Sequence, residues 1–217
     1  MDAFRSSRRK IFVIGNNKTG TTSMGAALQA LGFSLGSQAD AELLMEDWAK
    51  RDFRRIVDYC ETADAFQDVP FSLEFTYQVL DYAFPDSRYI LTVRNSSQEW
   101  YESLVRFHIR IVGKHRLPTA DELKSVSYRE MGWLWRTHEL IYGIDESSVF
   151  DRQVYIQNYE SRNRRILEYF RYRPDSLLVL NLSNPTAMAS LCDFLAIPPG
   201  MRNIAMPHLN SSRDAPA

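Results

Sequence analysis

The first candidate for chemistry in this sequence is a polar loop that begins at Gly15, ends at Gly20 and contains one lysine, Lys18. Four consecutive apolar residues, 11–14, precede the loop, and apolar residues at helical spacing follow it over 24–31. This order predicts a buried strand, a tight loop and a helix. Backbone amides in such a loop, together with the helix N-terminus, can converge on a phosphate or a similar oxyanion.

The position of Lys18 distinguishes this loop from the P-loop of nucleoside-triphosphate-binding proteins. That loop has two glycines five residues apart, followed at once by lysine and then by serine or threonine, whereas here Thr21 stands where the lysine belongs. A lysine inside the loop would contact the terminal group and bridging oxygen of a shorter phosphate chain. The alternative is an ordinary glycine-rich turn. The residues predicted to bind the anion are Asn17, Lys18, Thr19, Gly20, Thr21, Thr22 and Ser23.

Two charged residues stand at the ends of further predicted strands. Residues 63–70 predict a short strand that ends at Asp68, and Arg94 directly follows a strand predicted over 88–93. Ligands of open α/β sheets bind at the carboxyl ends of the strands, so both side chains are expected at that edge. An arginine there is expected to have an anionic partner. Alternatively, Asp68 caps a helix that begins near Ser72, and Arg94 pairs with a carboxylate of a neighbouring helix.

The remaining elements would position these residues. Apolar spacing predicts helices over 39–50, 53–62, 72–84 and 185–195 and a strand over 177–181. Residues 105–173 are helical in period and include a basic stretch over 106–116, which either borders an anionic ligand or is a solvated face. An amphipathic helix over 154–170 is expected to carry Arg162, Arg164 and Arg165 on its outer face. The predicted fold is α/β, a P-loop-like three-layer fold with a central parallel sheet flanked by helices, in a single domain over residues 1–217.

Composition narrows the class of protein. The chain has 217 residues, 45% of them hydrophobic and 24% charged, which is typical of a globular protein. Its formal net charge of −1 argues against nucleic acid as a partner, so an anion site needs a local concentration of positive charge. Two cysteines, Cys60 and Cys192, are too few for a disulfide scaffold and favour a reducing compartment, the cytoplasm. The sequence predicts neither a signal peptide nor a membrane span.

The glycine-bounded loop resembles the 5′-phosphosulfate loop of sulfotransferases that use 3′-phosphoadenosine 5′-phosphosulfate (PAPS), in which a Lys-x-Gly-Thr-Thr-like sequence contacts the donor. Residues 66–70, Phe-Gln-Asp-Val-Pro, are similar to the Lys-Thr-His-x-Pro sequence of that family, with Asp68 in place of the histidine. Residues 194–198 and 206–210 are similar to the FL-x-x-P and FP-x-x-N sequences that close one bacterial and eukaryotic group. The similarity covers residues 10–33, 64–104 and 177–210.

The resemblance implies that Lys18 stabilises the reacting group and that Asp68 is the general base. A carboxylate with an ordinary pKa is a weak base, so this role requires burial that raises the pKa of Asp68. Glu74, one turn into the helix predicted from Ser72, is the second candidate. Its alternative is a first-turn acid favoured by the helix dipole.

The resemblance also implies a clamp on the 3′-phosphate of the donor, formed by Arg94 and Ser103. The separation of these two residues is one residue longer than in the family pattern, so either the turn over 95–97 holds an insertion or Ser96 or Ser97 takes the role of Ser103. Arg202, in the closing segment, could fold over the nucleotide.

Together these features predict an enzyme that transfers a sulfuryl group from PAPS to a hydroxyl or amine acceptor and releases 3′-phosphoadenosine 5′-phosphate (PAP), without a metal ion. The acceptor would be a small molecule, a glycan or a lipid, and a homodimer is possible. The first alternative is a P-loop kinase that uses ATP and Mg²⁺, although the lysine after the second glycine is missing. The second is a non-catalytic nucleotide-binding module.

Overall fold

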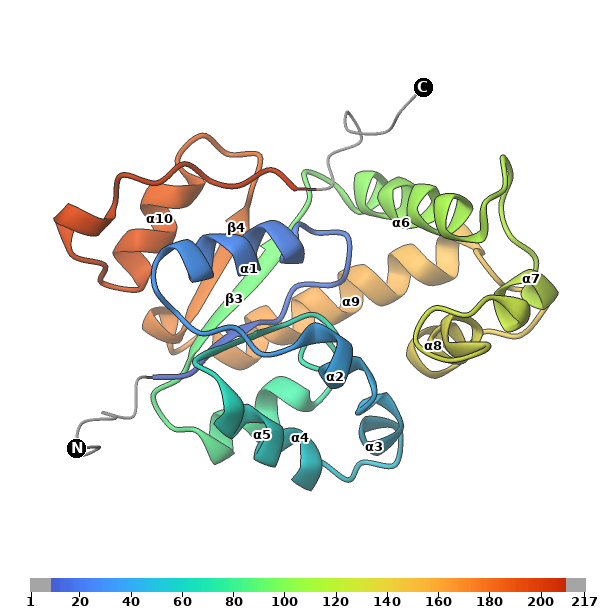
Figure 1. Cartoon of the computed structure of the whole chain (residues 1–217), viewed down its shortest axis with the longest axis horizontal. Helices are drawn as coiled ribbons and strands as arrows, with labels where there is room; N and C mark the ends of the chain where they lie inside the picture. The colour runs from blue at the N-terminus through green and yellow to red at the C-terminus, as the bar shows by residue number, and fades with distance from the viewer. Residues whose placement is uncertain (1–8, 210–217) are drawn as a thin grey trace.

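A four-stranded parallel sheet with the order β2-β1-β3-β4 forms the centre of the computed structural model, which describes residues 9–209 (Figure 1). The strands are β1 (Ile11–Val13), β2 (Ala65–Gln67), β3 (Arg88–Val93) and β4 (Leu177–Asn181). In the register, Val13 pairs with Gln67 on one side and with Ile90 on the other. The loop after β1 therefore lies between the ends of β2 and β3. Asn210, the last residue of the predicted closing segment, lies outside the described residues.

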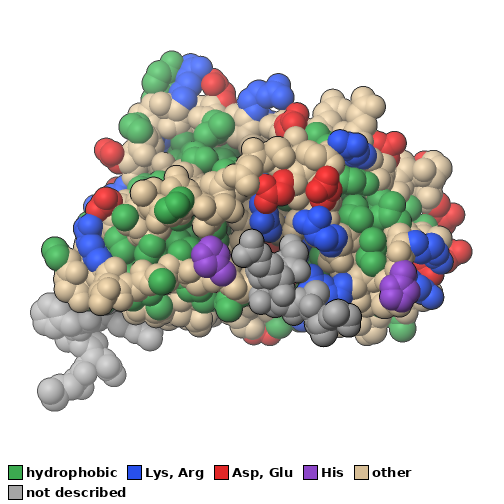
Figure 2. Space-filling model, turned by 90° about the horizontal axis from the view of Figure 1, so that it is seen from above, with side chains coloured by type: hydrophobic (Ala, Val, Ile, Leu, Met, Phe, Trp, Pro, Cys, Tyr) green, Lys and Arg blue, Asp and Glu red, His purple; other side chains and the backbone are tan. Residues whose placement is uncertain are grey.

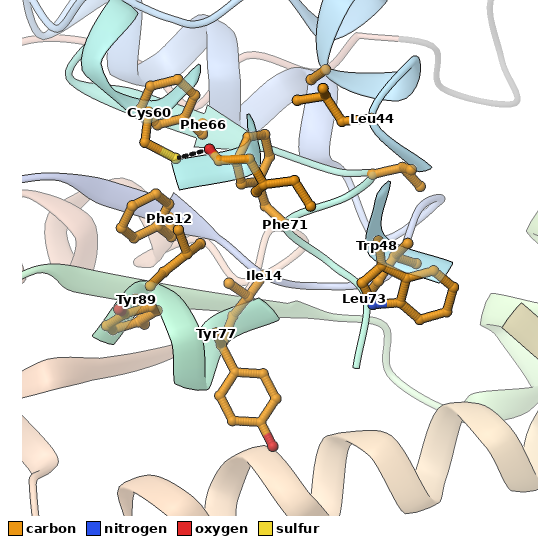
Figure 3. Packing of buried hydrophobic residues seen from close by; sticks show 14 of the residues in the cluster. Phe12, Ile14, Leu44, Trp48, Cys60, Phe66, Phe71, Leu73, Tyr77 and Tyr89 are labelled. Atoms are coloured by element: carbon orange, nitrogen blue, oxygen red, sulfur yellow. Dashed lines mark hydrogen bonds between the residues drawn. The ribbon is translucent and has the colours of Figure 1, made fainter. Parts of the chain in front are cut away.

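Helices cover both faces of this sheet, which confirms the predicted α/β class. On one face lie α1 (Thr21–Ala30) and α10 (Ala187–Phe194), and on the other lie α2 (Gln38–Glu42), α3 (Met45–Ala49), α4 (Arg54–Tyr59), α5 (Thr76–Ala83) and part of α9 (Arg152–Phe170) (Figure 1). Alternate residues of a strand point to opposite faces. Accordingly, Ile11 and Val13 pack against α1 and α10. Phe12 and Ile14 point to the other face, where they pack among aromatic side chains between the sheet and α2–α5 (Figure 3).

A third cluster of buried side chains holds the helices beyond β3. It joins α6 (Ser97–Val112), α7 (Ala120–Ser125) and α8 (Trp133–Tyr142) to the first half of α9. Trp100 of α6 stacks on Tyr159 of α9 with 4.5 Å between ring centroids, and its indole nitrogen donates to the carbonyl of Asn17 at 3.0 Å. This lobe is therefore fixed directly to the glycine-bounded loop.

The boundaries of several predicted elements need correction. The helix expected over 39–50 is two short helices, and the one expected over 53–62 ends in a 3-10 turn at Cys60–Thr62. Two further 3-10 turns lie at Pro174–Ser176 and Pro199–Met201. The helix expected from Ser72 begins only at Thr76, because Phe75 has a positive φ of 66° that a continuous helix cannot contain.

The prediction that Arg162 faces solvent was wrong. Arg164 and Arg165 are exposed, but Arg162 is only 3% exposed. Its side chain lies against Ile14, directly after β1. Within residues 9–209, no helix combines the length and the apolar character that crossing a membrane would need.

Candidate active site

The loop between β1 and α1 takes its shape from its two glycines. A Cβ on Gly15 would lie 2.0 Å from the hydroxyl oxygen of Thr92, so Gly15 lets β1 pass close to β3. Gly20 has a φ of 99°, which glycine adopts without strain, and it starts α1. Among the described residues, no side chain caps α1 at Gly20. The first backbone amides of α1 are therefore available to an anion.

Lys18 lies at the inner side of this loop, half-buried. Its ammonium nitrogen stands 3.4 Å from the ring centroid of Phe107, a residue of α6. Burial lowers the pKa of Lys18, and the nearby carboxylate of Asp68 opposes that shift. A desolvated ammonium beside the N-terminus of a helix gives the site a concentrated positive charge.

Asp68 directly follows β2 and faces the same loop. Its carboxylate accepts a hydrogen bond of 3.0 Å from the hydroxyl of Thr21 and another of 3.0 Å from the amide of Val69. The alternative role as a helix cap is wrong, because α5 begins only at Thr76. Burial raises the pKa of Asp68, while Lys18 and the bond from Thr21 act in the opposite direction. A carboxylate with a raised pKa is a stronger base.

Arg94 follows β3 and braces the loop from the other side. Its Nε donates to the carbonyl of Lys18 at 2.7 Å, and one Nη lies 3.4 Å from the hydroxyl of Ser103. The other Nη pairs with Glu99 at 3.3 Å. Glu99 and Ser103 lie four residues apart on α6, so both reach Arg94. The pairing of Arg94 with a carboxylate of a neighbouring helix, the alternative left open by the sequence, is thus present in the structure.

The serines considered as alternatives to Ser103 have other partners. Ser96 caps α6 by accepting from the amide of Glu99 at 3.1 Å. Ser97 donates to Glu160 at 2.6 Å. Of the three serines, only Ser103 lies within hydrogen-bond distance of Arg94 among the described contacts.

These residues surround one cavity of about 290 Å³, which we name the loop cavity. It brings together Lys18, Asp68 and Arg94, which come from the ends of three neighbouring strands. The face of the molecule seen in Figure 2 carries basic and acidic side chains side by side. Within the loop cavity, three basic side chains accompany one acidic side chain. Its lining residues are Lys18, Gly20, Thr21, Thr22, Asp68, Arg94, Ser103, Phe107, Arg110, Ile111 and Leu209.

Five of the predicted site residues do not line the loop cavity. The hydroxyl of Thr19 turns inward to the carbonyl of Asn16 and to Thr92, and that of Ser23 bonds the backbone of Leu209. Glu74 pairs with Arg165 at 2.9 Å, ahead of α5 rather than inside a helix. Arg202 donates to the carbonyl of Ile197 and pairs with Asp193, and it is not part of the loop cavity. Asn17 borders a smaller cavity beside this one.

That smaller cavity, of about 50 Å³, contains residues that the sequence did not single out. Lys18 and Asp68 border it together with Glu42 of α2. Glu42 is 6% exposed and pairs with Arg129, and burial raises the pKa of its carboxyl group. A second carboxylate thus stands near Asp68. Its buried position at the end of a short helix gave no signal in the sequence.

A buried chain of hydrogen bonds forms another wall of the small cavity. His108 Nδ1 donates to the carbonyl of Leu104 at 2.9 Å, and its Nε2 lies 2.9 Å from Nε2 of His138. His138 Nδ1 in turn accepts from the hydroxyl of Tyr155. Burial lowers the pKa of His108 to about 4 and that of His138 as well, so both rings are neutral at physiological pH. Both ring nitrogens of His108 thus have hydrogen-bond partners within the wall.

The arrangement suits transfer of a negatively charged group. Lys18 and the amides of α1 can stabilise charge that develops on an oxyanion, and Asp68 can accept a proton on the same side of the loop. In the part of the chain that the structure describes, no three His, Cys, Asp or Glu side chains form a cluster that could hold a metal ion.

Comparison with known proteins agrees with this geometry. No match to the chain is found among curated proteins. A family model described as a sulfotransferase domain matches residues 10–215, which include the loop, both strand-end residues and the closing segment. The match spans nearly the whole sequence, and the chain therefore belongs to the sulfotransferase family.

Proposed function

We propose that this protein transfers a sulfuryl group from PAPS to a hydroxyl or amine acceptor, with Asp68 as the general base. The observation that carries the proposal is the loop cavity, where Lys18, Asp68 and Arg94 line one space beside the uncapped N-terminus of α1. The lysine of this loop lies before the second glycine, and Thr21 follows that glycine. This arrangement fits the shorter 5′-phosphosulfate of PAPS better than the triphosphate of ATP.

The donor would lie with its 5′-phosphosulfate on the loop. During transfer the bond between sulfur and the bridging phosphate oxygen breaks, and a bond forms between sulfur and the acceptor oxygen or nitrogen. The bond electrons pass to the 5′-phosphate of PAP, so negative charge grows on the bridging oxygen. Lys18 and the first amides of α1 stabilise that charge.

The acceptor must lose a proton as the new bond forms. Asp68 takes this proton, and its raised pKa makes it a better base than an exposed aspartate. The Thr21 hydroxyl holds the carboxylate in place. Arg94 and Ser103 bind the 3′-phosphate of the donor, because both line the loop cavity and Arg94 carries a permanent charge. Arg110, exposed at the same cavity, adds to the attraction for the nucleotide.

Two measurements test the proposal. Calorimetry should show binding of PAP to the full chain and no comparable binding of ATP with Mg²⁺. Sulfate transfer from PAPS should then be measured across phenols, aliphatic alcohols, sugars and amines, with Glu74→Gln as a control that leaves the loop cavity intact. Tighter binding of ATP than of PAP would refute the donor assignment. Binding of PAP without transfer to any acceptor would support a nucleotide-binding module instead.

A further inference from the structure

A second, larger cavity lies on the other side of the glycine-bounded loop. It has a volume of about 940 Å³ and is formed between α3, α5, α8 and α9. It shares no lining residue with the loop cavity. We name it the α9 cavity, and its size is that of a site for a ligand of drug-like dimensions.

The walls of the α9 cavity are largely apolar and aromatic. Trp48 comes from α3, Tyr77 from α5, Tyr142 from α8 and Tyr169 from α9, so four helices each contribute a ring. Figure 3 shows Tyr77 pointing from α5 toward α9 and Trp48 beside Leu73. Such walls can bury the body of an aromatic or aliphatic molecule.

The charged residues of the α9 cavity do not balance. Its two glutamates are both neutralised, because Glu74 pairs with Arg165 and Glu168 pairs with Arg171. The cavity is also lined by Arg51, Arg162 and Arg164, which have no carboxylate within salt-bridge distance among the described residues. An excess of positive charge therefore surrounds an apolar space.

Arg162 is the most unusual of these arginines. Its side chain is 3% exposed, and one Nη donates to the carbonyl of Ile14 at 2.6 Å. Its Nε and its other Nη are buried without a hydrogen-bond partner among the described residues. A buried charge with unused donors is costly unless a partner satisfies it. Burial lowers the pKa of Arg162 to about 10, so it is still protonated at neutral pH.

We propose that the α9 cavity binds an organic anion, with its oxyanion group at the Arg162 guanidinium and its aromatic or aliphatic body against Trp48, Tyr77 and Tyr142. Because the two free nitrogens are buried, the anion reaches them after a side-chain adjustment in the cavity wall, a common change on binding. The exposed arginines Arg51 and Arg164 attract the anion toward the cavity. This proposal does not depend on the sulfuryl-transfer chemistry of the loop cavity.

The test uses naphthoate, naphthyl phosphate and dodecanoate, each beside its neutral amide or alcohol, with the full chain. Binding is followed by calorimetry and by tryptophan fluorescence, since Trp48 lines the cavity. Each probe is titrated both without PAP and with PAP at a saturating concentration, so that competition with the loop cavity can be detected. At least one anion should bind about ten- to a hundredfold more tightly than its neutral counterpart, the range expected for hydrogen bonds to a charged group.

Variants locate the site. Arg162→Met should remove the preference for the anion and leave PAP binding unchanged. Arg152→Met, an exposed arginine on the same helix but outside the cavity, is the matched control and should bind as the wild type does. If Arg162→Met fails to fold, Gln78→Trp fills the cavity from α5 without changing an arginine and should weaken every probe.

Three results would overturn the proposal. The first is equal binding of anionic and neutral probes, or no binding of either, which would mean that water satisfies Arg162. The second is anion binding without PAP that is lost when PAP is added, which would place the anions in the loop cavity. The third is unchanged anion binding in both Arg162→Met and Gln78→Trp.

Discussion

Replacing Asp68 by asparagine separates binding of the donor from removal of the acceptor proton. Asparagine has the same shape, and its one side-chain oxygen can keep the 3.0 Å bond from the Val69 amide while its NH2 group donates to the hydroxyl of Thr21. The variant should therefore fold and bind PAP, because neither the loop amides nor Arg94 changes. Loss of a general base typically lowers the rate about 100- to 10 000-fold, and we expect a decrease in that range for single-turnover transfer from PAPS.

The pH dependence gives the same prediction a second readout. Transfer needs the ionised form of Asp68, so the rate should fall as the pH drops through the pKa of that carboxyl group in the folded protein. Burial raises this pKa, which places the acid limb above the ordinary range of aspartate. Transfer also needs the charged form of Lys18, whose pKa burial lowers. The alkaline limb should accordingly lie below the ordinary range of lysine, and the profile should be bell-shaped.

Thr21→Val makes the argument quantitative. The Thr21 hydroxyl favours the ionised carboxylate, and its removal should raise the pKa of Asp68 further. A hydrogen bond to a charged group is worth about 1.5–3 kcal/mol, and each pKa unit corresponds to about 1.36 kcal/mol, so the acid limb should move up by about one to two pH units. Thr22→Val is the control, because Thr22 lines the same cavity without a described bond to Asp68. An unchanged rate in Asp68→Asn, or an acid limb that Thr21→Val leaves in place, would refute the assignment of the base.

The other predictions concern the donor site and the loop. Lys18→Met should lower single-turnover transfer about 100- to 1000-fold, the usual cost of removing one oxyanion-stabilising donor, with a smaller loss of PAP affinity measured by calorimetry. Arg94→Ala should weaken PAP binding about ten- to a hundredfold and Ser103→Ala about tenfold or less, because only arginine is charged; a larger loss from the serine would reverse the proposed roles. Gly15→Ala places a Cβ 2.0 Å from the hydroxyl oxygen of Thr92 and should lower the free energy of unfolding by about 1–3 kcal/mol in urea titration, and wild-type stability would contradict the described packing of β1 on β3.

Local sequence was sufficient where an element depends on its own residues. The strands expected over 88–93 and 177–181 have those bounds in the structure, because each is a short apolar run between turn residues. The same holds for the loop after β1, where glycine spacing alone indicated a strand, a tight turn and a helix start. For Gly15 the sequence indicated the turn but not the second reason for glycine. The missing Cβ also makes room for Thr92 of β3, which is distant in the sequence.

Helix boundaries and ion pairs that depend on residues distant in the chain could not be predicted from the sequence. The start of α5 is delayed by the positive φ of Phe75, which no propensity of residues 72–75 indicates. Glu42 and Arg129 form their ion pair across a sequence separation of 87 residues, so Glu42 looked like any polar residue of a short helix. The choice among three serines near Arg94 likewise needed the orientation of α6, because the sequence does not show which hydroxyl faces the guanidinium.

Arg162 is different, because the sequence did contain the signal for its burial. The buried residues of α9 are Tyr155, Tyr159, Arg162, Ile166 and Phe170, which follow one another at intervals of three or four residues. Helical spacing therefore puts Arg162 on the same face as four large aromatic or apolar side chains, and Arg164 and Arg165 off it. The expectation that a charged side chain faces solvent outweighed this periodicity. An arginine that stays on the apolar face of a helix, next to a cavity and with donors unused, imposes a cost on folding that an apolar residue would avoid. An anion bound in the α9 cavity would offset that cost by satisfying the unused donors of Arg162.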